Sequence, residues 1–273
     1  MTESILVKRD GRIGHIIFNR PEKLNAFNED LLTRFDAALQ ELSRDSGISV
    51  IILSGEGRAF SVGYDVDRSD DSGYSGAVNE HGVWEDWESL REKNQRWLRV
   101  WDTPKPVISV IEGYCMGGAT QLSVCTDITV VSEDAVIGWP SIPLGGGLLS
   151  PPTAWLVGPK KAKELSYIAG SRMSGKLAAE RGWANYAVAK GTAMDKALEL
   201  AREIVKMPLD LLRIKKIALN RQFDNQGFRE SFLAGAEWDA LAHTANGVHV
   251  MIDKVNDLGL KGAITWFNSE ENN

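Results

Sequence analysis

The sequence contains only two cysteines, Cys115 and Cys125, and four histidines among its 273 residues. Two cysteines are too few for a disulfide framework, and neither they nor the histidines stand at the spacing of a zinc site. We expect no metal site. We predict that both cysteines are buried as small apolar residues, as free cysteines usually are.

Long apolar runs and dense runs of basic residues are also lacking. No apolar run approaches the length of a membrane span, and residues 1–8 show no signal region, so we expect a cytoplasmic protein that makes no membrane contact. The net charge is −6 at pH 7, and the basic segments 160–163 and 213–216 are short, so nucleic acid is not an expected partner.

Two common catalytic patterns are incomplete. Residues 170–176 match the first seven positions of a Walker A loop, but Leu177 stands where a serine or threonine would bind magnesium. Residues 161–168, which precede it, have a helical pattern where a nucleotide-binding loop needs a strand. No serine occupies a G-x-S-x-G turn either, so neither nucleotide hydrolysis nor a serine-hydrolase triad is expected.

The apolar periodicity predicts an α/β fold. A hairpin turns at Asp10-Gly11, and a helix capped by Asn28 then leads to a buried parallel strand. We expect a core over residues 1–200 and a C-terminal helical region over residues 201–273. The strands are predicted at 5–7, 13–18, 50–53, 107–111 and 128–131, and the helices at 87–100, 204–220, 229–244 and 248–258. The polar segment 67–83 is predicted to be a lid loop.

Two glycine-containing segments, residues 57–66 and 113–121, each follow an apolar strand-like run. Gly63 and the pair Gly117-Gly118 let the backbone approach a ligand closely, and a helix that begins near Gly118 adds the positive end of its dipole. Backbone amides in such a setting polarise a carbonyl oxygen. The two segments therefore suggest the two halves of an oxyanion hole.

Three segments resemble, in the expected order, the signatures of the crotonase (enoyl-CoA hydratase/isomerase) superfamily. They are Asn19-Arg20-Pro21-Glu22-Lys23-Leu24-Asn25-Ala26, Arg58-Ala59-Phe60-Ser61-Val62-Gly63-Tyr64-Asp65-Val66, and Gly113-Tyr114-Cys115-Met116-Gly117-Gly118-Ala119 followed by Cys125-Thr126-Asp127. The resemblance implies a spiral of ββα units and a homotrimer or dimer of trimers assembled through the C-terminal helices. It also implies a coenzyme A thioester as substrate and no prosthetic group.

The resemblance assigns roles to individual residues. The amides of Tyr64 and Gly118 would form the oxyanion hole. The residues that match coenzyme A-binding positions or lie in the same signature are Lys23, Leu24, Ala26, Arg58, Ser61, Gly63, Asp65 and Val66. Lys23 and Arg58 supply charge for phosphate groups. The alternative is that these two side chains are solvated surface charges.

The pair of glutamates with which hydratases of this superfamily add water is missing. Without a gap, the two positions are occupied by Gln121 and Ser141. An amide and an unassisted hydroxyl have no suitable pKa for general base catalysis near neutral pH. Three readings stay open: a lyase, decarboxylase or other enolate chemistry; a slow or unusual hydratase; and a protein that binds acyl-CoA without turnover.

In the first reading, protons are handled by other groups. The candidates are Asp65, Glu80, His81, Glu85, Asp86 or a group on the substrate. For Asp65 we favour a structural role at the following turn. Trp84, Trp87 and Trp139 are candidates for lining an acyl pocket, although packing explains them equally well, and Trp97 and Trp101 are expected to pack a helix.

Overall fold

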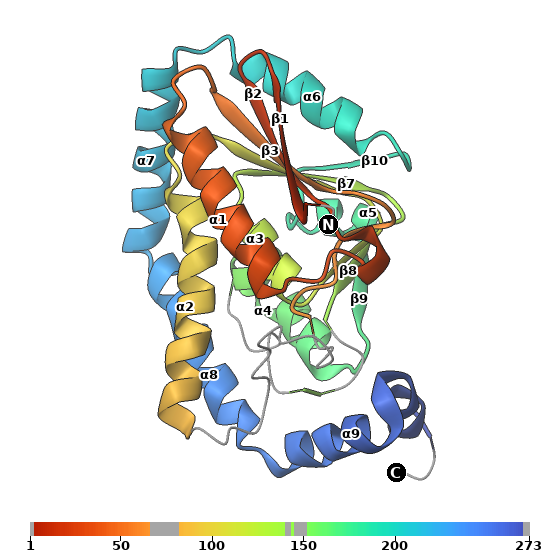
Figure 1. Ribbon diagram of the computed structural model, residues 1–273. Helices are drawn as coiled ribbons and strands as arrows, with labels where there is room; N and C mark the ends of the chain where they lie inside the picture. The colour runs from red at the N-terminus through yellow and green to blue at the C-terminus, as the bar shows by residue number, and fades with distance from the viewer. Residues whose placement is uncertain (1–2, 66–81, 140–142, 145–151, 270–273) are drawn as a thin grey trace.

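The computed structural model describes residues 3–65, 82–139, 143–144 and 152–269 (Figure 1). Its strands form a six-stranded sheet in the order β1-β2-β3-β5-β7-β10 and a four-stranded sheet in the order β4-β6-β8-β9. The strands are β1 (Ile5–Asp10), β2 (Ile13–Phe18), β3 (Val50–Gly55), β4 (Ala59–Ser61), β5 (Val107–Ile111), β6 (Tyr114–Met116), β7 (Ile128–Ser132), β8 (Val136–Gly138), β9 (Arg172–Ser174) and β10 (Tyr186–Val188).

Helices surround the two sheets and extend beyond them. They are the 3₁₀ helix η1 (Pro21–Lys23) and the α-helices α1 (Glu29–Arg44), α2 (Val83–Asp102), α3 (Gly118–Val124), α4 (Pro152–Tyr167), α5 (Gly175–Glu180), α6 (Ala193–Ile204), α7 (Leu209–Asn225), α8 (Phe228–His243) and α9 (Asn246–Phe267). No helix in the described ranges is long and apolar enough to span a bilayer.

The N-terminal unit forms as the pattern predicts. β1 and β2 pair antiparallel with Asp10 opposite Ile13, and Gly11 in the turn has a φ of +55°. The Asn28 side chain accepts a hydrogen bond from the Leu31 N–H at 3.0 Å and so caps α1. β3 then pairs parallel to β2, which confirms the predicted crossover.

The main hydrophobic core lies between the larger sheet, α1, α2 and α3. Phe18, Phe35 and Trp97 are fully or almost fully buried there. Cys115 and Cys125 are buried in the same core, as predicted, and burial raises the pKa of the Cys115 thiol to about 12. Neither thiol is therefore available as a nucleophile near neutral pH.

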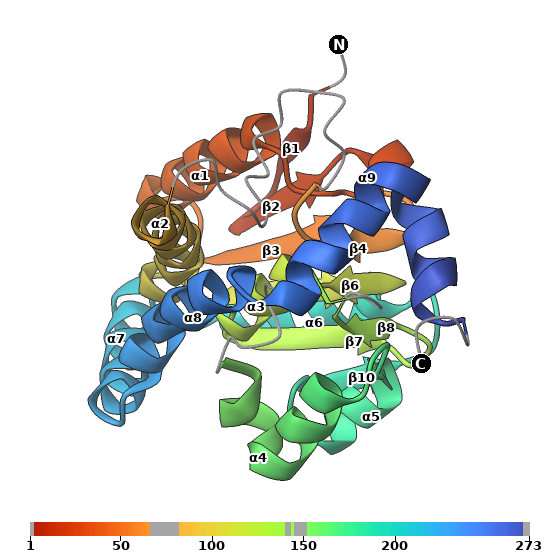
Figure 2. The ribbon, with the colours of Figure 1, turned by 90° about the horizontal axis from the view of Figure 1, so that it is seen from below.

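Helices α2 and α8 lie side by side, and α9 turns away from them (Figures 1 and 2). The Asn94 amide on α2 donates to the Phe232 carbonyl on α8 at 3.1 Å, a bond that fixes the two helices in register. Helix α9 bends at Gly259, whose φ is +67°. The α2–α8 pair thus forms one wall beside α3.

Several predicted boundaries were wrong for identifiable reasons. The helix expected at 204–220 is displaced to Leu209–Asn225, because Ile204 is the last residue of α6 and Pro208 caps the start of α7. Helix α2 begins four residues earlier than predicted, at Val83. Strands β4, β6, β8 and β9 of the smaller sheet span three residues each, which is too short for the period-2 pattern to show.

Candidate active site

The two glycine segments meet where β4 and β6 end. A Cβ atom built on Gly63 would lie 2.8 Å from the Met116 carbonyl oxygen and 2.9 Å from the Gly118 nitrogen. Gly63 also has a φ of +86°, which disfavours other residues. Close approach of the two backbones therefore requires glycine at this position, and it brings the predicted halves of the oxyanion hole together.

The Tyr64 and Gly118 segments are held from both sides. The Phe27 N–H donates to the Gly63 carbonyl at 2.8 Å, and the Asp65 N–H donates to the Phe27 carbonyl at 3.0 Å. On the other side, the Gly117 N–H donates to the Gly138 carbonyl at 3.0 Å. These bonds fix the backbone that carries the two predicted donors before any ligand arrives.

Gly118 is the first residue of α3, so its N–H has no acceptor within that helix. The ring of Tyr64 lies directly over it, because a Cβ atom on Gly118 would meet Tyr64 Cε2 at 2.7 Å. Only a residue without a side chain leaves room for this ring. The side chain of Tyr64 and the first turn of α3 therefore form one surface.

The segment predicted to hold the nucleotide end of the ligand is attached to the turn between β3 and β4. The Asn25 amide donates to the Ala59 carbonyl at 2.8 Å and to the Glu56 carbonyl at 2.9 Å, and the Val62 N–H donates to the Leu24 carbonyl at 3.2 Å. Leu24 and Asn25 both have positive φ values, so this loop is constrained.

The structure thus brings together the two segments that hold the predicted coenzyme A-binding residues, namely residues 23–26 and residues 58–65. Lys23 at the end of η1 is half-buried, Arg58 is exposed, and Ala26 is buried. The Ser61 hydroxyl accepts a hydrogen bond from the Gly63 N–H at 3.1 Å, which helps to shape the glycine turn. Whether Lys23 and Arg58 bind phosphates stays a prediction.

Asp65 is buried and ion-paired. Its Oδ2 lies 3.0 Å from Nη1 of Arg20, and the same guanidinium nitrogen donates to the Ala26 carbonyl at 2.6 Å. The carboxylate therefore links the glycine turn to the loop after β2. This placement supports the structural reading of Asp65 over a role in proton transfer.

The other candidates for acid or base catalysis differ in position and in burial. Gln121 lies buried in α3, three residues after Gly118. On α2, Glu85 is exposed, whereas Asp86 is buried. Val66, Glu80, His81 and Ser141, together with most of the predicted lid, lie outside the described residues.

Lys93 on α2 is a titratable group that lies against the ring of Tyr64. Its Nζ lies 5.5 Å from the centroid of the Tyr64 ring. Burial lowers the pKa of Lys93, an effect that the negative charges of Asp86 and Glu29 oppose and that the Arg96 charge reinforces. A partly desolvated ammonium group thus stands beside the predicted oxyanion hole.

His243 at the end of α8 is a residue whose role the sequence did not reveal. Its Nδ1 lies 2.7 Å from Oδ2 of Asp86, and both side chains are almost fully buried. The two residues are 157 positions apart in the chain, so no spacing pattern connects them. Only the packing of α2 against α8 makes the pair visible.

The tryptophans proposed for an acyl pocket differ in their exposure to solvent. Trp84 is exposed and packs on Trp87, with ring centroids 4.8 Å apart, whereas Trp139 is buried directly after β8. Trp97 and Trp101 are buried, as their helical spacing predicts. Among the residues that the structure describes, no three His, Cys, Asp or Glu side chains gather as a metal site.

Comparison with known proteins gives a consistent picture. A family model described as "Enoyl-CoA hydratase/isomerase" matches residues 8–249. The "Probable enoyl-CoA hydratase" of Rhizobium meliloti (strain 1021) is 32% identical over 228 residues, which cover 81% of this chain and 83% of that protein.

Solved structures match over almost the whole chain. A protein from Novosphingobium aromaticivorans DSM 12444 is 34% identical, with a TM-score of 0.89 over 98% of this chain and 96% of that one. An enoyl-CoA hydratase/isomerase from Xanthobacter autotrophicus Py2 is 30% identical, with a TM-score of 0.88 over 98% of each chain. The predicted fold class is confirmed.

Proposed function

The chain belongs to the enoyl-CoA hydratase/isomerase (crotonase) family, and we propose that it binds a coenzyme A thioester whose carbonyl oxygen is held by the amides of Tyr64 and Gly118. The observation that carries the proposal is the contact between the two glycine segments. The Cβ position of Gly63 lies 2.9 Å from the Gly118 nitrogen, so both donors belong to one compact and preorganised site.

The nucleotide part of the ligand extends toward η1 and the β3–β4 turn in this proposal. Lys23 and Arg58 provide positive charge for its phosphates, and Leu24 and Ala26 contribute backbone and apolar surface. The hydrogen bonds from Asn25 to the Ala59 and Glu56 carbonyls support it, because they hold both segments at one place. Coenzyme A enters only as part of the substrate, with no prosthetic group.

The chemistry that we propose is an enolate reaction other than ordinary hydration, such as that of a lyase or decarboxylase. Gln121 and Ser141 replace the two glutamates of the hydratases, and neither can exchange a proton readily near neutral pH. In a decarboxylation, the carbon–carbon bond breaks, carbon dioxide leaves, and the bonding electron pair becomes part of the enolate. The enolate oxygen then needs hydrogen-bond donors more than it needs a pair of carboxylates.

Assembly into a homotrimer or dimer of trimers through residues 201–273, around a core of residues 1–200, is part of the proposal. Its support is a set of exposed apolar side chains on α7. They are Leu211, Ile214, Ile217, Leu219 and Phe223. Such a surface on one helix is typical of a protein interface.

The second candidate is a protein that binds acyl-CoA without turnover. It is favoured by one observation. Gln121, which is buried in α3 three residues after Gly118, carries an amide where a hydratase has a glutamate. A binder would show the same affinity for thioesters and no bond change in any of them.

The direct test is calorimetry with butyryl-CoA, followed by mass spectrometry of malonyl-CoA incubated with the protein. We expect micromolar binding and release of carbon dioxide with formation of acetyl-CoA. Absence of binding to any acyl-CoA would refute the proposed function. Binding with every thioester recovered unchanged would favour the non-catalytic alternative.

A further inference from the structure

Lys93 lies on the face of α2 that packs against the rest of the protein. The side chain is half-buried, Asn94 beside it is buried, and Trp97 one turn further along is fully buried. Residues four positions apart share a helix face, so Lys93 enters the molecule beside Trp97. Moving an ammonium group out of water is costly, and lysine is rarely retained at such a place without a role. Lys93 is therefore a candidate for binding or chemistry.

The ammonium group of Lys93 lies against one half of the predicted oxyanion hole. Its Nζ is 5.5 Å from the centroid of the Tyr64 ring. The same ring packs on Gly118, since a Cβ atom at that residue would lie 2.7 Å from Tyr64 Cε2. A single aromatic side chain thus connects the ammonium group on α2 to the first turn of α3.

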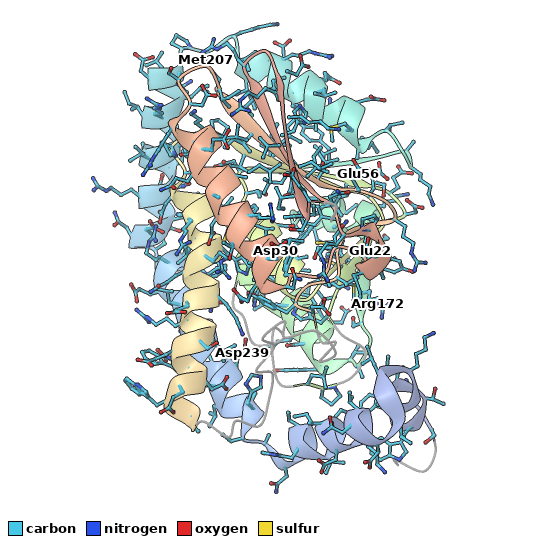
Figure 3. All side chains as sticks on the ribbon, viewed as in Figure 1. Glu22, Asp30, Glu56, Arg172, Met207 and Asp239 are labelled. Carbon is cyan, nitrogen blue, oxygen red and sulfur yellow. The ribbon has the colours of Figure 1, made fainter. Side chains whose placement is uncertain are left out.

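The arrangement of the elements directs an acyl chain toward α2. In Figures 1 and 2, α3 lies between α2 and the red 3₁₀ helix η1. Figure 3 shows this separation through labelled residues, because Glu22 in η1 and Asp239 on α8, which packs on α2, lie on opposite sides of the lower end of α1. A thioester held at Tyr64 and Gly118, with its nucleotide toward Lys23, extends its acyl carbons away from η1. Helix α2 lies on that side.

The charges of the protein compensate the ammonium group only in part. Burial lowers the pKa of Lys93. The negative charges of Asp86 and Glu29 oppose this effect, and the Arg96 charge reinforces it. The pKa is lowered on balance, so the folded protein stabilises the charged form less well than water does. A carboxylate brought by a ligand would meet an ammonium group that has already lost part of its hydration, which strengthens the attraction between them.

We propose that the ammonium group of Lys93 binds a carboxylate on the acyl part of the substrate, so that the substrates are coenzyme A thioesters of dicarboxylic acids. Lys93 donates hydrogen bonds to this carboxylate, while the amides of Tyr64 and Gly118 hold the thioester oxygen. The two anchors fix both ends of the acyl group. The inference rests on the proposed function and specifies a substrate class that the glycine segments alone leave open.

The test is calorimetry with succinyl-CoA and butyryl-CoA. The two acyl groups have the same number of carbon atoms, and the first carries a terminal carboxylate where the second carries a methyl group. We expect the wild-type protein to bind succinyl-CoA about 10- to 100-fold more tightly, which is the contribution of a hydrogen bond to a charged group. Equal affinities, or tighter binding of butyryl-CoA, would overturn the inference.

Lys93→Met replaces the ammonium group by an apolar side chain. We expect its affinity for succinyl-CoA to fall about 10- to 100-fold, while its affinity for butyryl-CoA stays at the wild-type value. Lys93→Arg keeps the positive charge and should retain part of the preference. If Lys93→Met does not fold, Lys93→Gln carries the same comparison. An equal loss of affinity for both thioesters in the neutral variant would show that Lys93 acts by packing alone, and would overturn the assignment.

Arg99→Met is the matched control. It removes one positive charge from the same helix, at an exposed position where Arg99 pairs with Asp36. We expect this variant to keep the full preference for succinyl-CoA. A loss of preference equal to that in Lys93→Met would show that the net charge of the protein, rather than Lys93, distinguishes the two thioesters.

The failures are distinguishable. Binding of both thioesters by the wild-type protein with equal affinity overturns the inference and leaves the proposed oxyanion hole intact. Absence of binding to both thioesters overturns the proposed function together with the inference.

Discussion

Gly118 and Tyr64 are in direct contact, since a Cβ atom on Gly118 would lie 2.7 Å from Cε2 of the tyrosine ring. The two residues belong to segments more than fifty positions apart, yet each limits what the other can be. A larger residue at 118 would displace the ring, and displacement of the ring would alter the surface over the first turn of α3. The predicted oxyanion hole is thus a single packed unit.

Replacing Gly63 by alanine should disrupt this unit. Its positive φ and the two backbone atoms within 3 Å of the added Cβ leave no room for relaxation by a side chain. We expect Gly63→Ala to lower the free energy of unfolding by more than about 2 kcal/mol and to abolish detectable butyryl-CoA binding. Urea denaturation and calorimetry measure the two effects.

Gly11→Ala is the matched control for Gly63→Ala. Gly11 also has a positive φ, but nothing lies within 4 Å of its Cβ position. It should therefore cost only the backbone strain, about 1 to 2 kcal/mol, and leave binding unchanged. Equal losses of stability and normal binding in both variants would contradict the role given to Gly63.

The Arg20–Asp65 pair should be essential for stability. Removing the guanidinium in Arg20→Met takes the ion-pair partner away from a buried carboxylate, at a cost of about 3 to 5 kcal/mol in the free energy of unfolding. Arg34→Met, which breaks an exposed pair with Asp30, should cost less than about 1 kcal/mol. Denaturant titration that gives similar values for the two variants would show that the pair at Asp65 is not structural.

The buried side chain of Lys105 should make the free energy of unfolding depend on pH. The side chain is fully buried and donates to the Leu42 and Asp45 carbonyls, and burial, with help from the Arg213 charge, lowers its pKa from 10.5 to about 8. Between these values the unfolded chain holds the proton that the folded chain has lost. The free energy of unfolding therefore rises with pH across this window, by about 3 kcal/mol from this group.

Comparison with Lys105→Met isolates this group from the others that titrate in the same range. Denaturation at pH 7.5 and at pH 10 should show that the wild-type protein gains stability relative to the variant as the pH rises. A difference between the two proteins that is the same at both values would contradict the assignment of the lowered pKa.

Hydration of crotonyl-CoA tests the significance of Gln121 and Ser141. With neither glutamate present, we expect hydration at least about 100-fold slower than in a family member that has both, because general acid–base catalysis contributes at least this factor. The absorbance of the conjugated thioester measures the rate. Turnover equal to that of the two-glutamate enzyme would show that other side chains replace them fully.

Much of this architecture was predictable from local pattern. Asn28, the Asp10-Gly11 turn and the glycine segments each act through their own backbone, so the chain reveals them directly. The start of α7 depended on Pro208, a local signal that the periodic apolar residues obscured. The strands of the smaller sheet were hidden because three residues carry no period.

The polar half of the candidate site was not predictable. Asp65 pairs with Arg20 and Asp86 pairs with His243 because separate elements pack together, and no sequence spacing encodes either contact. Lys93 is similar, since its charged character is ordinary for a helix and its altered pKa arises from burial beside Tyr64. Sites built from backbone amides can be predicted from the positions of glycines in the sequence. Side-chain pairs between distant elements become visible only in the folded structure.

The most direct measurement compares Gly118→Pro with Gly118→Ala in α-proton exchange of butyryl-CoA. Both variants press on the Tyr64 ring, and proline is tolerated at the first residue of a helix, so the difference between them reports the missing N–H. The proposed oxyanion hole predicts that exchange in Gly118→Pro is slower than in Gly118→Ala by about 100- to 1,000-fold. Equal rates in the two variants would contradict it.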